Sequence, residues 1–505
     1  MSQATVPISL LSSRLINAQL PVQMSQSGSS SFEDEKVVTR AAVESGAQRL
    51  KPTHYLARSS QTFSHDHTRE FKGVGPSGSI RSYDGLRGVA CLIVYNFHYL
   101  YPYTRTNVRG FGVDFDPASN RNPHQLHFLC LLVRGRAMVT LFFGISGYVL
   151  SYHYLSAVRD QEWQTSQRRL ASLALRRWAR LYVPATISML FMAVMANLGA
   201  FDAGREFQGS DWLTGAWEEH PPRVSNFGGQ LKDYFVMWWN WSSPWTWMLY
   251  FNKYDPHTWT IPVEFRCSLV VFLMLLAGSR LKQPWRYGLT ISICIYCFAC
   301  NRWDVAIFAG GSFVADLHLH TLKKHQRNED ILPQHVTLRK PGLLRSVSHI
   351  AATAVFTAGL YLLSFPDEMA DQTPGFRTFD SVTPTGYTWN YTFWHALGGI
   401  FVVWAIEVLR PLQRFLTSRV PQYLGKISFA LYLVHGPLLH SAGFVLQPKI
   451  WQAIGHGSTT KWCGGLFLGW ITMLMLCLAS AHLFWKLVDV PIVKLVKHLE
   501  KRISI

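Results

Sequence analysis

Charged side chains are scarce in this chain of 505 residues, making up 15% of it, and acidic ones are scarcer than basic ones, at 30 against 48. Apolar residues, in contrast, make up 49% of the sequence. So little charge beside so much apolar surface argues against an ordinary soluble protein. The composition favours a protein that lies in a membrane.

Cysteine is also rare, with eight residues in the chain. Cys294, Cys297 and Cys300 have a spacing that resembles a metal cluster, but they fall within one apolar stretch and lack a second group of ligands. Cysteines placed in this way usually serve as small apolar side chains that pack between helices. The sequence therefore predicts neither a disulfide nor a bound metal.

Several patterns are missing from the chain as well. It shows no amino-terminal apolar stretch followed by a small-residue cleavage site, so we expect the first spanning helix to direct membrane insertion. No repeat occurs at the period of a solenoid. Two related halves, which secondary transporters often have, are not found either.

What the chain does have is a series of apolar blocks of about 18 to 24 residues, long enough to cross a hydrocarbon core about 30 Å thick. These blocks predict an all-α protein, a polytopic bundle of about ten transmembrane helices. The expected spans are residues 86–103, 137–155, 179–199, 258–278, 287–301, 303–320, 347–365, 392–409, 427–446 and 464–487.

Basic residues mark one side of the predicted membrane. The loops after the second, fourth, sixth and eighth spans collect Arg and Lys, whereas the loops on the other side carry more Asp and Glu. Because short cytoplasmic loops collect Lys and Arg, we expect both termini in the cytoplasm. Positive charge placed in this way indicates membrane topology and a lipid surface, with no role for nucleic acid.

A tryptophan-rich run at residues 238–247 tests this count, because an eleventh span there would invert every later loop. Tryptophan favours the headgroup level of a membrane, so we expect an interfacial re-entrant segment.

Three regions follow from these patterns. Residues 1–80 are rich in Ser, Gln, Glu and Arg and have no apolar period, which predicts a disordered cytosolic arm. Residues 81–492 form the membrane domain, and residues 493–505 form a short basic cytosolic tail. We expect the host membrane to be an endomembrane, like the endoplasmic reticulum, or the plasma membrane.

An arginine and a histidine share the first predicted span. Arg87 and His98 are eleven residues apart. At about 3.6 residues per turn they lie within about 20° of one helix face and about 16 Å apart along the axis. Ionisable groups are expensive to bury in a membrane, so a functional role is the default hypothesis for both.

Polar residues also enter the second and fourth predicted spans. Ser146 lies between Gly144 and Gly147, where small side chains allow either tight helix packing or contact with a ligand. Glu264 lies about a turn inside the fourth span. An unpaired carboxylate is costly there, so Glu264 either pairs with a buried cation or lines a polar cavity.

Two further groups have helical spacing. Arg176, Arg177 and Arg180 precede the third span, where they either anchor the helix at the interface or bind a phosphorylated ligand. In the ninth span, Tyr432 and His435 share one helix face with a serine. This face either lines a pocket, or His435 is a core histidine with its hydrogen bonds satisfied, and the pattern favours the two interpretations about equally.

Together these residues resemble the acyltransferase 3 family, integral membrane enzymes typified by those that O-acetylate bacterial surface polysaccharides. The resemblance runs from about residue 80 to 490. Its most specific element is an arginine and a histidine separated by ten residues in the first span, matched by Arg87 and His98. Four further matches occur in the family's order: residues 142–148, the basic stretch that ends at residues 180–182, residues 259–264 and residues 427–435.

The resemblance implies transfer of an acyl group, commonly acetyl, from acyl-CoA to a hydroxyl. Within it, His98 looks like the general base that deprotonates the acceptor hydroxyl, or like the group that shuttles its proton, because an imidazole titrates near neutral pH. Glu264 is the second expected catalytic residue, orienting a catalytic group or pairing with a buried arginine. Arg87 is expected to hold the donor's phosphates or orient its thioester. The other expected binding residues are Ser146, Arg176, Arg177, Arg180, Tyr432 and His435.

The expected partners are acyl-CoA, as a co-substrate with no bound cofactor, a hydroxyl-bearing acceptor and the lipid bilayer. Bacterial members often carry an extra hydrolase-like domain that this sequence does not show, so we expect the acceptor to meet the membrane domain directly. A long arm without that domain favours a small lipophilic alcohol of specialised metabolism, such as a terpenoid, sterol or polyketide. The alternatives are acylation of a glycan or lipid, a proton-coupled transporter and an inactive scaffold.

Overall fold

The computed structural model describes residues 77–114, 119–208, 210, 212–216, 218–331 and 342–503. The predicted arm, residues 1–80, lies outside the described residues except for its last four, which open the first helix. Its disorder therefore stays a prediction. Everything below concerns the described part of the chain.

Helices account for the regular structure of this part. One isolated bridge joins Arg109 and Glu368, and no strand is found among the described residues. Each of the ten predicted spans falls on a long helix: α1 (Ser77–Leu100), α2 (Gly135–Arg159), α3 (Trp163–Asn197), α6 (Thr260–Gly278), α7 (Gln283–Ala299), α8 (Trp303–Ile331), α9 (Gly342–Leu363), α11 (Asn390–Val408), α13 (Arg419–Leu438) and α15 (Thr459–Phe484). The prediction of an all-helical protein is confirmed.

Seven helical stretches in the described part are long and apolar enough to cross a membrane. They contain α2, α3, α6, α8, α11, α13 and α15, while α9 offers a shorter apolar stretch. Neither α1 nor α7 meets the same criterion. The count of ten spans and the side of the termini therefore stay predictions.

Six shorter helices lie between or after the predicted spans: α4 (Asp202–Gln208), α5 (Phe227–Trp241), α10 (Arg377–Ser381), α12 (Arg410–Leu416), α14 (Phe444–Ile454) and α16 (Val490–Ile503). The tryptophan-rich run thus begins inside a helix, and the side chain of Asn226 caps that helix by accepting from the Gly229 N–H at 2.7 Å. Trp239 is 75% exposed whereas Trp241 is buried. Only part of the run is free to face a membrane interface.

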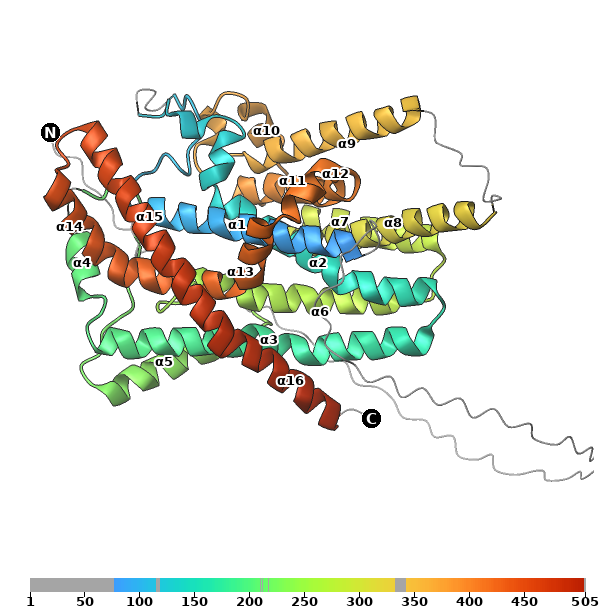
Figure 1. The fold of residues 1–505 in the computed structure, drawn as a ribbon, viewed down its shortest axis with the longest axis horizontal. Helices are drawn as coiled ribbons and strands as arrows, with labels where there is room; N and C mark the ends of the chain where they lie inside the picture. Colours follow the sequence, from blue (N-terminus) through green and yellow to red (C-terminus); the bar gives the residue numbers. More distant parts are fainter. Residues whose placement is uncertain are drawn as a thin grey trace, which may run out of the picture. The chain divides into compact units, whose positions relative to one another are not determined.

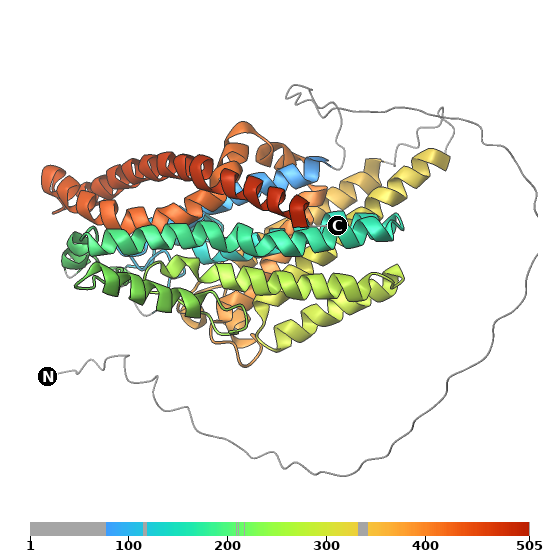
Figure 2. The ribbon, with the colours of Figure 1, turned by 90° about the horizontal axis from the view of Figure 1, so that it is seen from below.

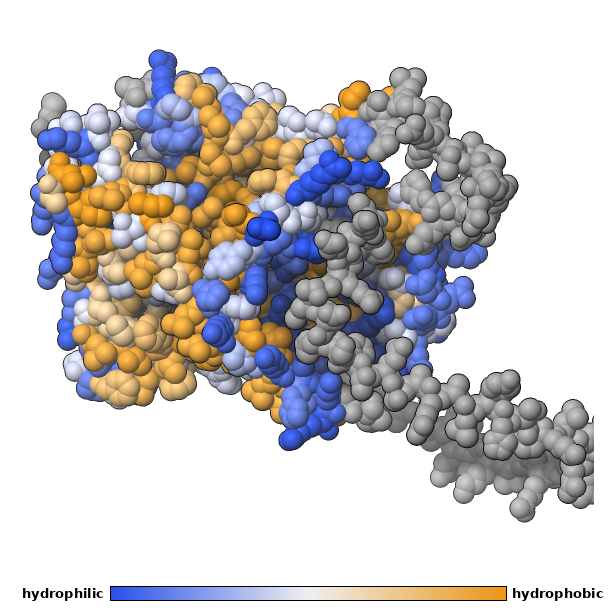
Figure 3. All heavy atoms as spheres, in the orientation of Figure 1, coloured by the Kyte–Doolittle hydropathy of each residue, from blue (hydrophilic) through white to orange (hydrophobic). Residues whose placement is uncertain are grey.

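The long helices lie side by side, and α15 and α16 cross them as one oblique helix (Figures 1 and 2). A π-helical segment, Trp485–Asp489 (η7), joins these two helices, and α16 packs on α3. Apolar residues gather over much of the face in Figure 3, with hydrophilic ones gathered over α16 and the neighbouring helix ends. The predicted basic tail is therefore mostly helical and docked on the bundle.

Glycine brings α1 and α13 into close contact. A Cβ atom on Gly425 would lie 2.1 Å from the backbone oxygen of Asp84, and one on Gly88 would lie 2.4 Å from the backbone nitrogen of Gly425. No side chain larger than hydrogen fits between backbones this close. The two helices that carry Arg87, His98, Tyr432 and His435 are thus fixed against each other.

A similar contact joins α2 and α8. A Cβ atom on Gly147 would lie 2.1 Å from the backbone oxygen of Phe308, and one on Gly311 would lie 2.1 Å from that of Gly144. The packing interpretation of the second span is therefore confirmed for its glycines.

Gly425→Ala should lower the stability of the bundle by about 1 to 3 kcal/mol, because the added methyl group forces α1 and α13 apart. The same substitution at Gly288 on α7 is a matched control, since its Cβ would meet nothing within 4 Å. Thermal unfolding of both variants in detergent measures the difference. Equal melting temperatures would contradict the proposed tight contact.

Candidate active site

A cavity of about 590 Å³ lies among α1, α2, α3, α6, α13 and α16. Seven of the nine residues predicted for the site line it: Arg87, Ser146, Arg176, Arg177, Arg180, Glu264 and Tyr432. These residues come from five helices that are far apart in the sequence. The other two, His98 and His435, do not line this cavity.

The cavity is strongly basic. Its lining contains six cationic side chains, Arg87, Arg169, Arg176, Arg177, Arg180 and Lys497, and two carboxyl groups, Glu264 and Asp489. Three residues of α16, Val493, Val496 and Lys497, contribute to the wall. The expected basic tail, residues 493–505, therefore contributes to the candidate site. Its basic composition alone did not indicate this.

Glu264 fits both interpretations of its place in the fourth span. Its Oε1 accepts hydrogen bonds from Arg177 Nη2 at 2.6 Å and from Ser146 Oγ at 2.9 Å. It lines the cavity at the same time. The ion pair neutralises one of the six cations and holds Arg177 against α6.

Arg87 and Arg180 are different, because the described residues give neither side chain an ion-pair or hydrogen-bond partner. Arg176, in contrast, pairs with Glu500 of α16 at 3.2 Å. A cation in a partly enclosed cavity is costly without a counter-charge. The free guanidinium groups of Arg87 and Arg180 are therefore suited to an anionic ligand.

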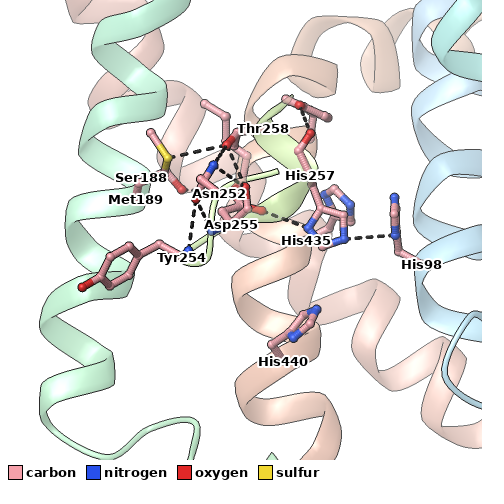
Figure 4. A network of polar contacts seen from close by, with 12 residues as sticks. His98, Ser188, Met189, Asn252, Tyr254, Asp255, His257, Thr258, His435 and His440 are labelled. Atoms are coloured by element: carbon pink, nitrogen blue, oxygen red, sulfur yellow. Dashed lines mark hydrogen bonds and ion pairs between the residues drawn. The ribbon is translucent and has the colours of Figure 1, made fainter. Parts of the chain in front are cut away.

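Histidines gather in a second cluster, beyond one end of the cavity. His98 comes from α1, His435 from α13, His440 from the π-helical segment Leu439–Gly443 (η6), and His257 from the 3₁₀ turn Pro256–Trp259 (η4) that precedes α6. The rings of His98 and His257 have centroids 4.0 Å apart, and that of His435 lies 5.3 and 5.1 Å from them. Figure 4 shows these rings converging from separate elements.

A line of hydrogen bonds runs through this cluster to a carboxylate. Asp255 Oδ1 lies 2.9 Å from His257 Nδ1, and His257 Nε2 lies 3.0 Å from His98 Nδ1 (Figure 4). Asp255 is buried, with 1% of its surface exposed, whereas the His98 side chain keeps 21% exposed. Only the His98 end of the line is open to an incoming molecule.

Glu218 adds a second carboxylate near His98. It lies 3.9 Å from His98 Nδ1 and 3.3 Å from His440 Nε2. Burial alone would raise the pKa of Glu218, but the neighbouring imidazoles of His440 and His98 hold that pKa well below the usual carboxyl range. Burial lowers the pKa of the neighbouring His220 to about 4, so that ring is neutral at pH 7.

The cavity and the histidine cluster are connected through two residues. The Tyr432 hydroxyl lines the cavity and donates to the backbone oxygen of His257 at 2.5 Å, and it lies 2.7 Å from Thr260 Oγ1. Val94 also lines the cavity, one turn before His98 on the same face of α1. A ligand that fills the cavity therefore ends close to the cluster.

Proline shapes the α13 side of the cluster. Pro437 has no N–H to donate to the backbone oxygen of Leu433, and Ser188 Oγ of α3 donates to that oxygen instead at 2.8 Å. The helix then widens into η6, which turns His440 toward Glu218.

His435 has one nitrogen engaged and one free. Its Nδ1–H donates to the backbone oxygen of Leu431 at 3.1 Å, while its Nε2 is buried without a hydrogen-bond partner among the described residues. His435 therefore packs against the cluster with one ring nitrogen unsatisfied among the described residues.

The sequence did not point to Asp255, His257, Glu218 or His440. The sequence did contain a pattern that could have indicated Asp255 and His257. The run Asp-Pro-His lies directly before the fourth span and places polar groups at its membrane boundary. In the sequence, Glu218 is one of the acidic loop residues that indicate which side of the membrane the loop lies on. His440 is five residues after His435, a spacing that shares no face in a regular α-helix, and only the π-helical segment brings it in.

Comparison with known proteins supports the resemblance drawn from the motifs. The family model described as an acyltransferase domain matches residues 80–484. The O-acetyltransferase PaAT-1 of Phomopsis amygdali is 28% identical over 469 residues, covering 86% of this chain and 87% of the relative. The acyltransferase clz18 of Cochliobolus lunatus is 25% identical over 464 residues, covering 84% and 96%. No solved structure matches.

Two groups in the cluster also have the composition of a metal site: His98, His257 and His435, and Glu218, His257 and His440, each with possible ligand atoms within 4.8 Å of one another. Hydrogen bonds to Asp255 and His98 already engage both nitrogens of His257. We therefore keep the prediction that the protein works without a metal.

Metal removal should leave activity unchanged. Elemental analysis of the purified protein should find well below one transition-metal ion per chain, and dialysis against EDTA should not change the rate. A stoichiometric zinc ion lost together with activity would contradict this.

Proposed function

We propose that this chain, which belongs to the acyltransferase domain family, transfers an acetyl group from acetyl-CoA to the hydroxyl of a small lipophilic alcohol. That it is an acyltransferase follows from the family; the donor and the acceptor are our proposal. The observation that carries it is the basic cavity, with two unpaired arginines, that ends beside a histidine open to solvent.

The charge of the cavity suits the donor. Coenzyme A carries several phosphate charges, and guanidinium groups bind phosphate through paired, charge-assisted hydrogen bonds. Arg87 and Arg180 supply such groups, and Arg177 is less available because Glu264 holds it. The volume, about 590 Å³, is within the range of small-molecule sites, about 300 to 1,000 Å³.

His98 is placed for general-base catalysis. The described residues make no hydrogen bond to its Nε2, which is left to take the proton of the acceptor hydroxyl. The hydroxyl oxygen then attacks the thioester carbonyl, and the tetrahedral intermediate collapses to an ester and the CoA thiolate. The imidazolium returns the proton to that thiolate, so the step yields an ester and CoA without another reactant.

The nature of the acceptor is supported by the name of one relative and by the fold. PaAT-1 is called an O-acetyltransferase, which agrees with acetyl transfer to oxygen. The reacting end lies among helices of the membrane domain, where a lipophilic alcohol can arrive from the bilayer. With both termini in the cytoplasm and ten spans, in an endomembrane or the plasma membrane, the basic cavity would face the cytosol, where acyl-CoA is made.

His98→Ala should reduce transfer by about 100-fold to 10,000-fold, the usual contribution of a general base. The measurement is transfer of radiolabel from acetyl-CoA by the protein in detergent, with decanol, geraniol and ergosterol offered as acceptors. The exposed His456 provides a control, His456→Ala, which should match wild type. Full activity in His98→Ala would remove that residue as the base.

Arg180→Ala should raise the KM for acetyl-CoA by about 10-fold to 100-fold, the value of a lost charge-assisted hydrogen bond. With acetyl-pantetheine, which has no phosphate group, the variant and wild type should have the same KM. Arg168→Ala, an exposed position on the same helix outside the cavity, is the control. Equal effects on both donors would contradict a phosphate contact.

A further inference from the structure

The segment before α6 is held in one conformation by its own side chains. Asn252 Oδ1 accepts from the backbone N–H groups of Tyr254 and Asp255, at 3.1 and 2.7 Å. Asn252 Nδ2 donates to the Asp255 backbone oxygen at 2.8 Å and to Thr258 Oγ1 at 2.7 Å. Asn252, Asp255 and Thr258 are all buried. The Asp255 carboxylate is thus fixed before any substrate arrives.

A glycine on α13 allows the next ring to take its place. A Cβ atom on Gly436 would lie 2.5 Å from His257 Nδ1 and 3.3 Å from Asp255 Oδ1. Any other residue there would displace the His257 ring from the carboxylate. The absence of a side chain at Gly436 is therefore a condition for the line of hydrogen bonds from Asp255 to His98.

We propose that Asp255 and His257 are positioning residues that select the reactive tautomer of His98. The inference rests on the proposed function, in which His98 is the base. The Asp255 carboxylate can only accept, so His257 Nδ1 carries a proton and donates it. In a neutral His257 the Nε2 then has a lone pair and accepts from His98 Nδ1–H. The remaining nitrogen of His98, Nε2, is left unprotonated and faces the acceptor.

The same line of hydrogen bonds, from Asp255 to His98, stabilises the imidazolium that forms when His98 accepts a proton. When His98 Nε2 takes the acceptor's proton, the ring becomes an imidazolium that still donates through Nδ1 to His257. The negative charge of Asp255 stabilises it through the neutral ring, as a carboxylate does in a catalytic triad. No net proton is gained or lost, because His98 passes the proton on to the CoA thiolate.

Other titratable groups face His98 and His257 from the elements around them. Glu218 approaches His98 Nδ1 from the loop before α5 at 3.9 Å, beyond hydrogen-bond distance. His435 of α13 packs against both rings, and His440 of η6 packs against His257 with centroids 5.8 Å apart. Neither His435 nor His440 donates a hydrogen bond to these two rings. Glu218 can only accept, so its charge favours the same proton on His98 Nδ1 that Asp255 selects through His257.

Asp255→Asn tests the inference, because an amide NH₂ group can donate to His257 Nδ1 and reverse both tautomers. With acetyl-CoA and decanol as probes, kcat for CoA release should fall at least about 100-fold. The KM for acetyl-CoA should stay within about twofold, since the cavity is untouched. Because the anion no longer stabilises the imidazolium, the acidic limb of the kcat/KM profile should move to lower pH.

Three further variants separate positioning from folding. Asp255→Glu, which keeps the carboxylate, should recover part of the lost kcat. Gly436→Ala should also lower kcat at unchanged KM, because it displaces the His257 ring with Asp255 intact. Asp371→Asn makes the same chemical change at an exposed position outside the cavity lining and the histidine cluster, and it should behave as wild type.

Each contrary result is decisive. Wild-type kcat and pH profile in Asp255→Asn would overturn the inference, and so would a loss of acetyl-CoA binding that accompanies every loss of kcat. If Asp255→Asn does not fold, an unchanged kcat in Gly436→Ala overturns it. No CoA release by the wild-type protein would instead reject the proposed function itself, and the inference with it.

Discussion

The close contact between α1 and α13 is the constraint on which the site depends. Gly88 and Gly425 leave no room for a side chain between the two backbones. One helix supplies Arg87 and His98, and the other supplies Tyr432 and the glycine against which His257 rests. A change in the separation of the two helices would alter the cavity and the histidine cluster together.

Several buried arginines in the described part of the chain have carboxylate partners. Arg266 pairs with Asp304, and Arg159 and Arg286 share Asp316, in each case with little exposed surface. Such pairs offset the cost of burying a charge but leave nothing for a ligand. Arg87 and Arg180 of the cavity have no such partner among the described residues, which is why we propose them as contacts for an anionic ligand.

The sequence was sufficient to predict the helices and most of the residues that line the basic cavity. Apolar blocks located ten helices, and the family's motifs named seven residues that line one cavity, because motifs on separate helices converge wherever the fold is shared. It was insufficient for the histidine cluster. Asp255 and His257 lie in an irregular turn, His440 depends on a π-helical segment, and α16 joins the cavity only through tertiary packing, so no period in the sequence reports them.

The length of α1 between Arg87 and His98 fixes the distance between these two side chains along the helix. Eleven residues at about 1.5 Å each set the two groups about 16 Å apart along the axis. If one holds the anion and the other meets the reacting hydroxyl, the donor's phosphates and its thioester must be separated by a comparable span. A compact activated donor, such as an acyl phosphate, could occupy one end of that span but not both.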